Sequence, residues 1–259
     1  MIFVDTHCHL YDEAFDGDRE AALQRAVDVG VTTLLLPDID RASTPRLEAL
    51  MSTHPEWCRP MAGLHPTSVR EDFEQELQHV HDRLFASACP SPFIAVGEIG
   101  MDLYWDRTYE EQQREAFKIQ MGWAEELDLP ACLHIRKAHN EVFGLLRDLN
   151  RRTYRGVMHC FGGSVQEAQR AIEMGFHLGI GGVVTFKNAT MAEVVKAVPL
   201  ERLLLETDAP YLTPAPYRGQ RNESAYIPLI AQRIADLRGI SLAEVAEATT
   251  ASARALFRL

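Results

Sequence analysis

Eight short apolar runs, each followed by a longer amphipathic stretch, are the feature that most constrains how this sequence folds. The ends of successive runs are 21 to 37 residues apart, about the length that one strand, one helix and two turns require. The predicted strands are 2–5, 32–36, 60–64, 93–97, 131–134, 155–159, 177–180 and 202–206. The alternation predicts the α/β class, specifically a (β/α)8 TIM barrel, for which about 250 residues is typical.

The stretches between the runs carry helical signals. Apolar residues recur every three or four positions across 70–88, and 225–258 is expected to be wholly helical. Four stretches begin with Ser or Thr followed three residues later by Glu, which is the pattern of a capping box. These pairs are Thr108–Glu111, Ser164–Glu167, Thr190–Glu193 and Ser241–Glu244.

No linker, low-complexity segment or charge block interrupts residues 1–259, so a single domain is expected. The rival architecture is an open doubly wound sheet. Such a sheet usually carries a glycine-rich phosphate loop after its first strand, and residues 5–9, which read DTHCH, are not one.

Charge and cysteine content narrow the function classes. The chain has 26 Lys and Arg against 37 Asp and Glu, a net charge of −11, which disfavours nucleic-acid binding through a broad basic face. An enzyme that handles phosphate through local positive charge, such as bound metal, remains compatible. No run approaches the ~18 apolar residues of a membrane span, and the N-terminus does not resemble a signal peptide. Five cysteines without a CxxC pair favour a reducing, cytoplasmic location.

Side chains typical of metal ligands gather at the carboxyl ends of the predicted strands. They are His7 and His9 after the first, Glu98 after the fourth, His134 and His159 ending the fifth and sixth, and Asp208 after the eighth. Because those ends converge on one rim of a barrel, we expect the six to meet there. Each histidine alone is better explained as a satisfied core residue, but a carboxylate among apolar neighbours needs a partner or a cation.

The donor set suits Zn²⁺, Mn²⁺, Ni²⁺ or Fe²⁺, and Mg²⁺ if waters complete its coordination. Six ligands exceed what one catalytic metal with an open position needs, so we predict two divalent ions sharing a carboxylate. Adjacent residues on extended chain point opposite ways, so Cys8 and Cys160 are expected in the core. The remaining histidines apart from His65 are expected to be structural, namely His54, His79, His81, His139 and His177.

Seven ordered segments resemble the TatD family of metal-dependent deoxyribonucleases, within the amidohydrolase-like metallohydrolases. The resemblance covers essentially the whole chain, and Ser224 departs from a proline that is common in the family. The segments are DTHCHL (5–10), GLHP (63–66), GEIGMD (97–102), HIRKA (134–138), HCFGG (159–163), LETDAPYL (205–212) and RGQRNE (218–223). The resemblance implies a barrel that hydrolyses DNA phosphodiester bonds with a divalent cation.

The resemblance also implies roles for the six ligands. His7, His9 and Asp208 would hold the first metal, His134 and His159 the second, and Glu98 would bridge them. Asp208 and Glu98 are the predicted catalytic residues, with Asp208 accepting the proton of a metal-activated water. We further predict that His65, Arg136 and Arg218 bind substrate phosphate, and that Glu206 and Asp5 orient the imidazoles.

Other functions remain open. The same dinuclear centre could hydrolyse a small-molecule amide, ester or lactone, because metal-activated water attacks carbonyl carbon as well as phosphorus. The complete ligand set disfavours a non-catalytic metal-binding barrel, and the surrounding imidazoles disfavour a Schiff-base enzyme using Lys137 or Lys187. Without a broad basic surface, DNA or a short oligonucleotide is expected to bind transiently over a short footprint. No membrane and no obligate protein partner is inferred.

Overall fold

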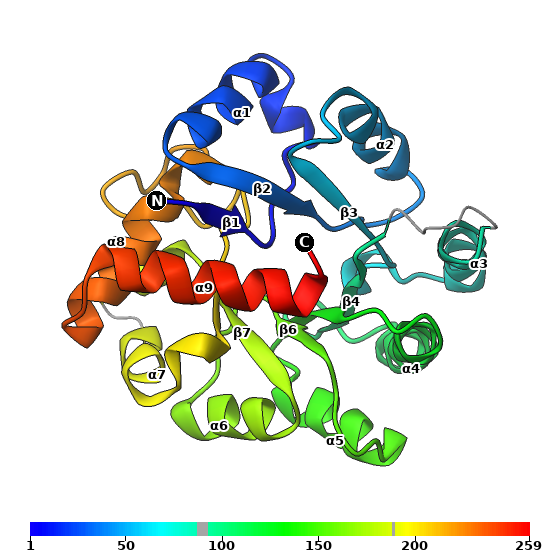
Figure 1. The fold of residues 1–259 in the computed structure, drawn as a ribbon. Helices are drawn as coiled ribbons and strands as arrows, with labels where there is room; N and C mark the ends of the chain where they lie inside the picture. Colours follow the sequence, from blue (N-terminus) through cyan, green and yellow to red (C-terminus); the bar gives the residue numbers. More distant parts are fainter. Residues whose placement is uncertain (87–92, 188–189) are drawn as a thin grey trace.

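A computed structural model describes residues 1–86, 93–187 and 190–259. Its strands surround a common centre and its helices lie outside them (Figure 1). The sheet order follows the sequence, and every neighbouring pair is parallel. The strands are β1 (Phe3–Asp5), β2 (Val31–Leu36), β3 (Cys58–Ala62), β4 (Ala95–Asp102), β5 (Ala131–Arg136), β6 (Gly156–Met158), β7 (Phe176–Ile180) and β8 (Leu203–Leu205).

The barrel closes between its first and last strands. The Thr6 amide donates to the Leu205 carbonyl at 2.9 Å, and Cys8 forms a parallel bridge with Ala209. All eight predicted strands overlap an observed one, so the (β/α)8 barrel is confirmed and the open doubly wound sheet is wrong.

The helices alternate with the strands. They are α1 (Arg19–Asp28), α2 (Thr44–Thr53), α3 (Phe73–Leu84), α4 (Glu110–Glu126), α5 (His139–Leu149), α6 (Val165–Glu173), α7 (Met191–Ala197), α8 (Ile227–Arg238) and α9 (Leu242–Phe257). Short 3-10 turns lie at Glu13–Phe15, Pro66–Ser68, Gly182–Thr185, Leu200–Arg202 and Ser224–Tyr226. None of the helices in the described ranges is long and apolar enough to cross a membrane.

Two helix predictions need correction. The segment 225–258 is two helices, because Gly239 adopts a left-handed φ of +66° that ends α8. Of the four predicted capping boxes, those at Ser164 and Ser241 form. Helix α4 begins after Tyr109, and Thr190 has helical dihedrals, so neither Thr108 nor Thr190 caps its helix. The last two residues of the predicted helix 70–88 lie outside the described residues.

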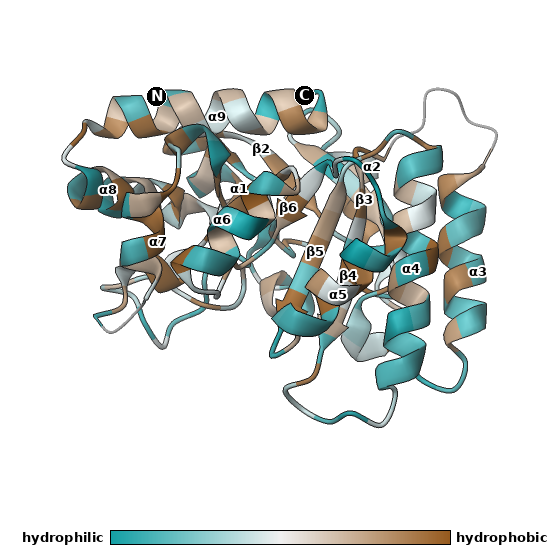
Figure 2. Ribbon diagram, turned by 90° about the horizontal axis from the view of Figure 1, so that it is seen from below, coloured by the Kyte–Doolittle hydropathy of each residue, from teal (hydrophilic) through white to brown (hydrophobic). Residues whose placement is uncertain are grey.

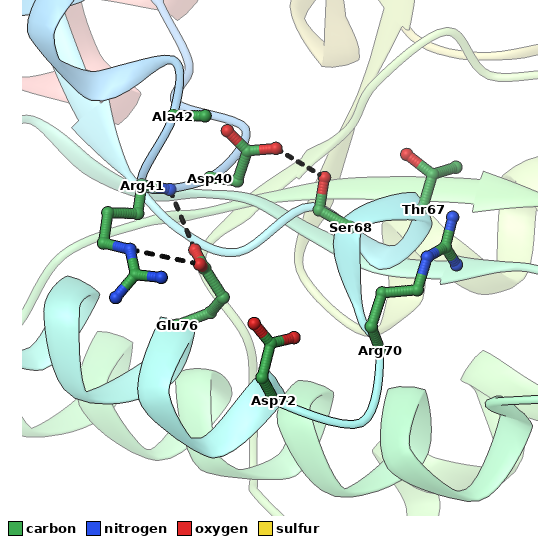
Figure 3. Close-up of a pocket in the computed structure, with 8 residues that line it drawn as sticks. All are labelled: Asp40, Arg41, Ala42, Thr67, Ser68, Arg70, Asp72 and Glu76. Carbon is green, nitrogen blue, oxygen red and sulfur yellow. Dashed lines mark hydrogen bonds and ion pairs between the residues drawn. The ribbon is translucent and has the colours of Figure 1, made fainter.

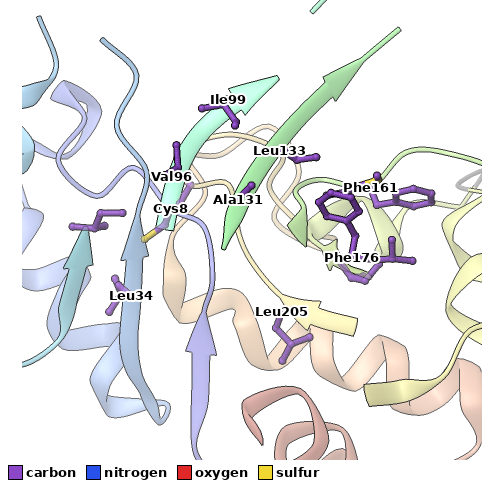
Figure 4. Close-up of a cluster of buried hydrophobic side chains, with 14 of the residues drawn as sticks. Cys8, Leu34, Val96, Ile99, Ala131, Leu133, Phe161, Phe176 and Leu205 are labelled. Atoms are coloured by element: carbon purple, nitrogen blue, oxygen red, sulfur yellow. The ribbon is translucent and has the colours of Figure 1, made fainter. Parts of the chain in front are cut away.

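Side chains between the strands and the helices form most of the core. Figure 4 shows Leu34, Ile99, Leu133 and Phe176 among them, contributed by strands on both sides of the barrel. A second cluster fills the barrel interior at the amino ends of the strands, where Leu256 and Phe257 of α9 pack over it. Figure 2 shows α9 lying across that end, beside both chain termini. Helix α9 therefore covers the amino ends of the strands and leaves their carboxyl ends accessible for a functional site.

Candidate metal centre

Five imidazoles surround the buried Glu98 carboxylate at the carboxyl ends of the strands. One carboxylate oxygen, Oε2, lies 3.0 Å from His7 Nε2 and 4.0 Å from His9 Nε2. The other, Oε1, lies 2.8 Å from His134 Nδ1, 3.4 Å from His65 Nε2 and 3.9 Å from His159 Nε2. Each oxygen therefore has its own set of nitrogen atoms, which is the arrangement a bridging carboxylate requires.

Asp208 lies beside three of the imidazoles. Its Oδ1 is 3.8 Å from His7 Nε2, 3.6 Å from His9 Nε2 and 3.5 Å from His159 Nε2. The Asp208 amide donates to the His7 carbonyl at 2.9 Å, which ties the segment after β8 to the segment after β1. The structure thus brings all six predicted ligands together, although up to 201 positions separate them in sequence.

The segment that follows β1 positions the first two histidines. His7 and His9 point to the same side, with their Nε2 atoms 3.3 Å apart, and the rings of His7 and His159 stack with centroids 3.4 Å apart. Three groups of potential ligand atoms each lie within 4.8 Å of one another: His7, His9 and Glu98; His7, His159 and Glu206; and His65, Glu98 and His134. Nitrogen and carboxylate donors converging from buried side chains fit a divalent metal.

The charge state of Glu98 follows from its neighbours. Burial alone would raise the pKa of this carboxyl, but the imidazoles around it, His159 and His134 among them, hold it well below its usual range. Glu98 is therefore ionised, as a bridging ligand must be. Burial and the neighbouring His159 lower the pKa of His7, which keeps that imidazole neutral with a lone pair for a metal.

Two of the histidines are held in the charged form by carboxylates. Burial works against the charge of His159, yet Glu206, Glu98 and Asp208 raise its pKa to about 10. Burial likewise opposes the charge of His134, and its bonds to Asp102 and Glu98 raise the pKa to about 9. A metal ion would have to displace these protons on binding.

Each imidazole has one nitrogen that faces the cluster and one outer nitrogen. The partner of the outer nitrogen determines where the ring hydrogen sits, and so whether the inner nitrogen can bind a metal. Tyr11 Oη donates to the Pro37 carbonyl at 2.6 Å, so at its 2.9 Å contact with His9 Nδ1 it must accept. His9 Nε2 is then free of hydrogen and available as a ligand. In the two charged rings the outer nitrogen meets an acceptor carboxylate: His159 Nδ1 is 3.0 Å from Glu206 Oε1, and His134 Nε2 is 2.9 Å from Asp102 Oδ2. Loss of the inner proton to an incoming metal ion would leave the inner nitrogen of each ring as a ligand.

His65 has the opposite arrangement. The Thr67 amide donates to His65 Nδ1 at 3.1 Å, so the ring hydrogen sits on Nε2, which points into the cluster. Burial keeps the pKa of His65 low and the ring neutral. His65 therefore points a hydrogen-bond donor into the cluster, which suits a phosphate oxygen.

Other predicted site residues have different partners from those expected. The Asp5 carboxylate accepts from the Thr207 amide at 2.9 Å, the Thr207 hydroxyl at 2.6 Å and the His7 amide at 3.3 Å. Asp5 thus orients backbone rather than an imidazole, unlike Glu206. Arg136 and Arg218 are exposed at the rim and lie on aromatic rings, with Cζ 3.9 Å from the Tyr104 ring centroid and 4.0 Å from that of Phe186.

Three contributors were missed by sequence reasoning. Asp102 and Tyr11 hold the outer nitrogens of His134 and His9, and Cys132 Sγ lies 3.4 Å from His7 Nδ1. Asp102 and Tyr11 each stand close in sequence to a predicted ligand, and that proximity was the available signal. Cys132 is two residues before His134 on β5, but nothing in the sequence relates it to His7.

A cavity of about 460 Å³ lies between the segments after β2 and β3, and none of the six predicted ligands lines it (Figure 3). Glu76 accepts from the Arg41 amide at 2.8 Å, and Ser68 Oγ donates to Asp40 at 2.8 Å. The carboxylates of Glu76 and Asp40 therefore have hydrogen-bond partners among the residues that line the cavity.

Comparison with known proteins gives matches along nearly the whole chain. The family model described as TatD related DNase matches residues 4–258. The chain is 36% identical over 260 residues to the uncharacterized metal-dependent hydrolase YabD of Bacillus subtilis, covering 100% of both. It is 33% identical to the 3'-5' ssDNA/RNA exonuclease TatD of Pantoea ananatis, over 98% of this chain and 99% of the relative.

The crystal structure of YjjV, a TatD homologue from Escherichia coli, has the same fold. It matches with a TM-score of 0.88 and 32% identity, over 99% of this chain and 98% of that one. The fold, the clustered ligands and the match along nearly the whole sequence lead to one conclusion: the chain belongs to the TatD related DNase family.

Proposed function

We propose that this chain is a divalent-metal-dependent deoxyribonuclease that hydrolyses DNA phosphodiester bonds, with residues 1–259 as one domain. The observation that carries the proposal is the Glu98 carboxylate, whose two oxygens face separate sets of imidazoles beside Asp208. Relatives named as metal-dependent hydrolases and as a 3'-5' ssDNA/RNA exonuclease support the reaction class. Four cysteines of the described ranges are free, which fits a cytoplasmic location.

The proposed centre would hold two divalent ions, Zn²⁺, Mn²⁺, Ni²⁺ or Mg²⁺. His7, His9 and Asp208 would hold one, His134 and His159 would hold the other, and Glu98 would be shared between them. Such ions would supply an activated water and stabilise the entering and leaving oxygens.

The residues of the chain perform the remaining steps. Burial opposes ionisation of Asp208, but His159, His9 and His7 lower its pKa, so the carboxylate is charged and can accept a proton. At 16% exposure its side chain is more open than that of Glu98, at 2%. We assign Asp208 to take the proton of the attacking water and return it to the leaving oxygen. His65 Nε2–H donates to a phosphate oxygen, and Arg136 and Arg218 at the rim supply positive charge.

The net charge of −11 limits the substrate. A surface of this charge repels a polyanion except where bound cations reverse the local field. Binding is then confined to a few nucleotides, which favours strand ends and short single strands over long duplex.

The test is hydrolysis by the purified chain with each metal added. Short single-stranded DNA labelled at either end should be cut faster than duplex, and Glu98→Gln should lose more than about a hundredfold, because even outer partners of metal ligands are worth 10–100-fold. Glu74→Gln, on the exposed face of α3, is the matched control and should keep full activity.

An ester, a lactone and a cyclic amide are assayed in parallel. If the chain hydrolysed one of these compounds but no phosphodiester, the result would support the alternative function, a small-molecule metallohydrolase. Full phosphodiesterase activity in metal-loaded Glu98→Gln would refute the assigned centre.

A further inference from the structure

Exposed aromatic side chains gather at the rim of the metal centre. In residues 1–86, 93–187 and 190–259, four Tyr, Trp or Phe side chains are exposed, and all lie in the segments that follow β4 or β8. They are Tyr104, Trp105, Tyr211 and Tyr217. Trp105 is 72% exposed, whereas Trp57 and Trp123 are partly buried against the core. Packing therefore explains the other tryptophans but not Trp105.

Three rim side chains form one surface, which we call the Trp105 platform: Tyr104, Trp105 and Arg136. The two aromatic rings meet edge to face, with centroids 4.9 Å apart. Arg136 Cζ lies 3.9 Å from the Tyr104 centroid and 5.2 Å from the Trp105 centroid, within the range of a cation–π contact. The guanidinium and the tyrosine ring thus support the exposed indole.

A single carboxylate joins the platform to the metal centre. Asp102 Oδ2 lies 2.9 Å from Nε2 of the proposed ligand His134, and Asp102 Oδ1 accepts from the Tyr104 amide at 3.0 Å. Arg136 follows His134 by two residues on β5 and is paired in register with Asp102 on β4. The platform is therefore fixed next to the position where a scissile phosphodiester would lie.

We propose that the Trp105 platform binds a nucleobase of a single-stranded nucleic acid by stacking, and so places the adjoining phosphodiester at the metal centre. The inference rests on the proposed nuclease function. Every base has a π-face, so stacking on an aromatic ring supplies affinity without reading sequence. Arg136 adds a positive charge to the same surface, where it can meet the backbone phosphate. A chain with a net charge of −11 needs such a source of affinity, because long-range electrostatics oppose binding.

The first test compares two substrates in Trp105→Ala. A ten-nucleotide single strand should show a KM about tenfold higher, the usual scale for losing one stacked base. An abasic strand of the same length, which has the phosphodiesters but no base to stack, should be hydrolysed within about twofold of the wild-type rate. Trp105→Phe retains a ring and should recover most of the affinity. Ile119→Ala, an exposed apolar residue on α4, should behave as wild type.

The second test does not depend on hydrolysis. The affinity of fluorescein-labelled dT10 with phosphorothioate linkages, which resist cleavage, is measured by anisotropy for the metal-loaded wild type and for Trp105→Ala, and again with an abasic strand of the same length and linkages. The wild type should lose about tenfold on the abasic strand, and the variant should bind both strands equally. An RNA strand should show the same dependence on Trp105, because the ring contacts the base and not the sugar.

The two tests separate the two proposals. A wild type that cleaves neither substrate would overturn the nuclease function, while the anisotropy data would still test the platform. Equal KM and equal affinity in wild type and Trp105→Ala would overturn the platform, with the nuclease function intact. Loss of abasic-strand hydrolysis in Trp105→Ala would also overturn it, because Trp105 would then act through the metal centre.

Discussion

Gly179 on β7 leaves the space that the Glu206 carboxylate occupies, and filling that space gives a sharp test of the site. A Cβ at residue 179 would lie 2.1 Å from Glu206 Oε2 and 2.6 Å from Cδ, closer than real contacts allow. Glu206 is fully buried, and its Oε1 lies 3.0 Å from His159 Nδ1 and accepts from the Cys160 amide at 2.6 Å. In Gly179→Ala the carboxylate must therefore move and release His159.

The expected magnitude has two parts. Overpacking a buried site costs about 1–3 kcal/mol of unfolding free energy, which in a chain of this size lowers Tm by roughly 2–4 °C per kcal/mol. Loss of the carboxylate that orients a ligand imidazole should cost about 10–100-fold in metal affinity. The effect on metal binding should therefore exceed what a modest loss of stability explains.

Gly181→Ala is the matched control. A Cβ at residue 181 would lie 3.6 Å from the nearest Glu206 atom, an ordinary contact, and the φ of −105° suits any residue. Tm is measured by calorimetry with and without metal, and metal affinity by titration calorimetry. If Gly179→Ala bound metal as tightly as Gly181→Ala, the position of Glu206 would not depend on this close approach and the reasoning would be refuted.

Three further predictions concern single side chains. Tyr11→Phe removes the hydroxyl that His9 contacts, so metal affinity measured by titration calorimetry should fall about 10–100-fold; an unchanged affinity would contradict the role of Tyr11. Ser241→Ala should cost about 1 kcal/mol in urea unfolding and Thr190→Ala almost nothing, because only Ser241 accepts from the amide of its third helical residue; equal costs would contradict this. Burial and Arg202 lower the pKa of His177 from 6.5 to about 4, so the unfolded chain binds more protons between these values and stability should fall as pH drops from about 6.5 towards 4. His177→Gln should flatten that part of the pH–stability curve by about 1–3 kcal/mol, after allowance for partial exposure, and an unchanged slope would contradict the assignment.

The barrel was predictable because its period is long and repeated. Each apolar run had to become a strand buried on both faces, and eight such strands in sequence order leave few other topologies. The ends of the elements were less certain. Strand β4 continues from the predicted end at residue 97 to Asp102, so Glu98 lies inside the strand rather than after it. The apolar residues Ile99 and Met101, two positions apart, were a sign that the strand continues, but the glycines at 97 and 100 weakened the strand pattern.

The ligand cluster was predictable for the same reason as the barrel, since parallel strands bring their carboxyl ends together whatever their separation in sequence. Contacts between side chains of different loops were not. The ring under Arg218 belongs to Phe186, and Asp5 reaches Thr207 across the closing strands. Such pairs depend on side-chain direction and on loop geometry, for which the periodicity of the sequence carries no information.

The acidic surface and the aromatic rim together have a consequence for how salt affects binding. A protein that binds DNA through many lysines and arginines releases one counterion per phosphate it neutralises, so its affinity falls steeply as salt rises. Here the net charge is −11, and the two arginines at the rim lie on aromatic rings. If stacking on Trp105 supplies much of the affinity, few counterions are released, and a plot of log affinity against log salt concentration should have a slope near that for one or two phosphates. A slope several times steeper would mean that phosphate contacts dominate the affinity. A short footprint would then no longer explain how a chain with a net charge of −11 binds nucleic acid.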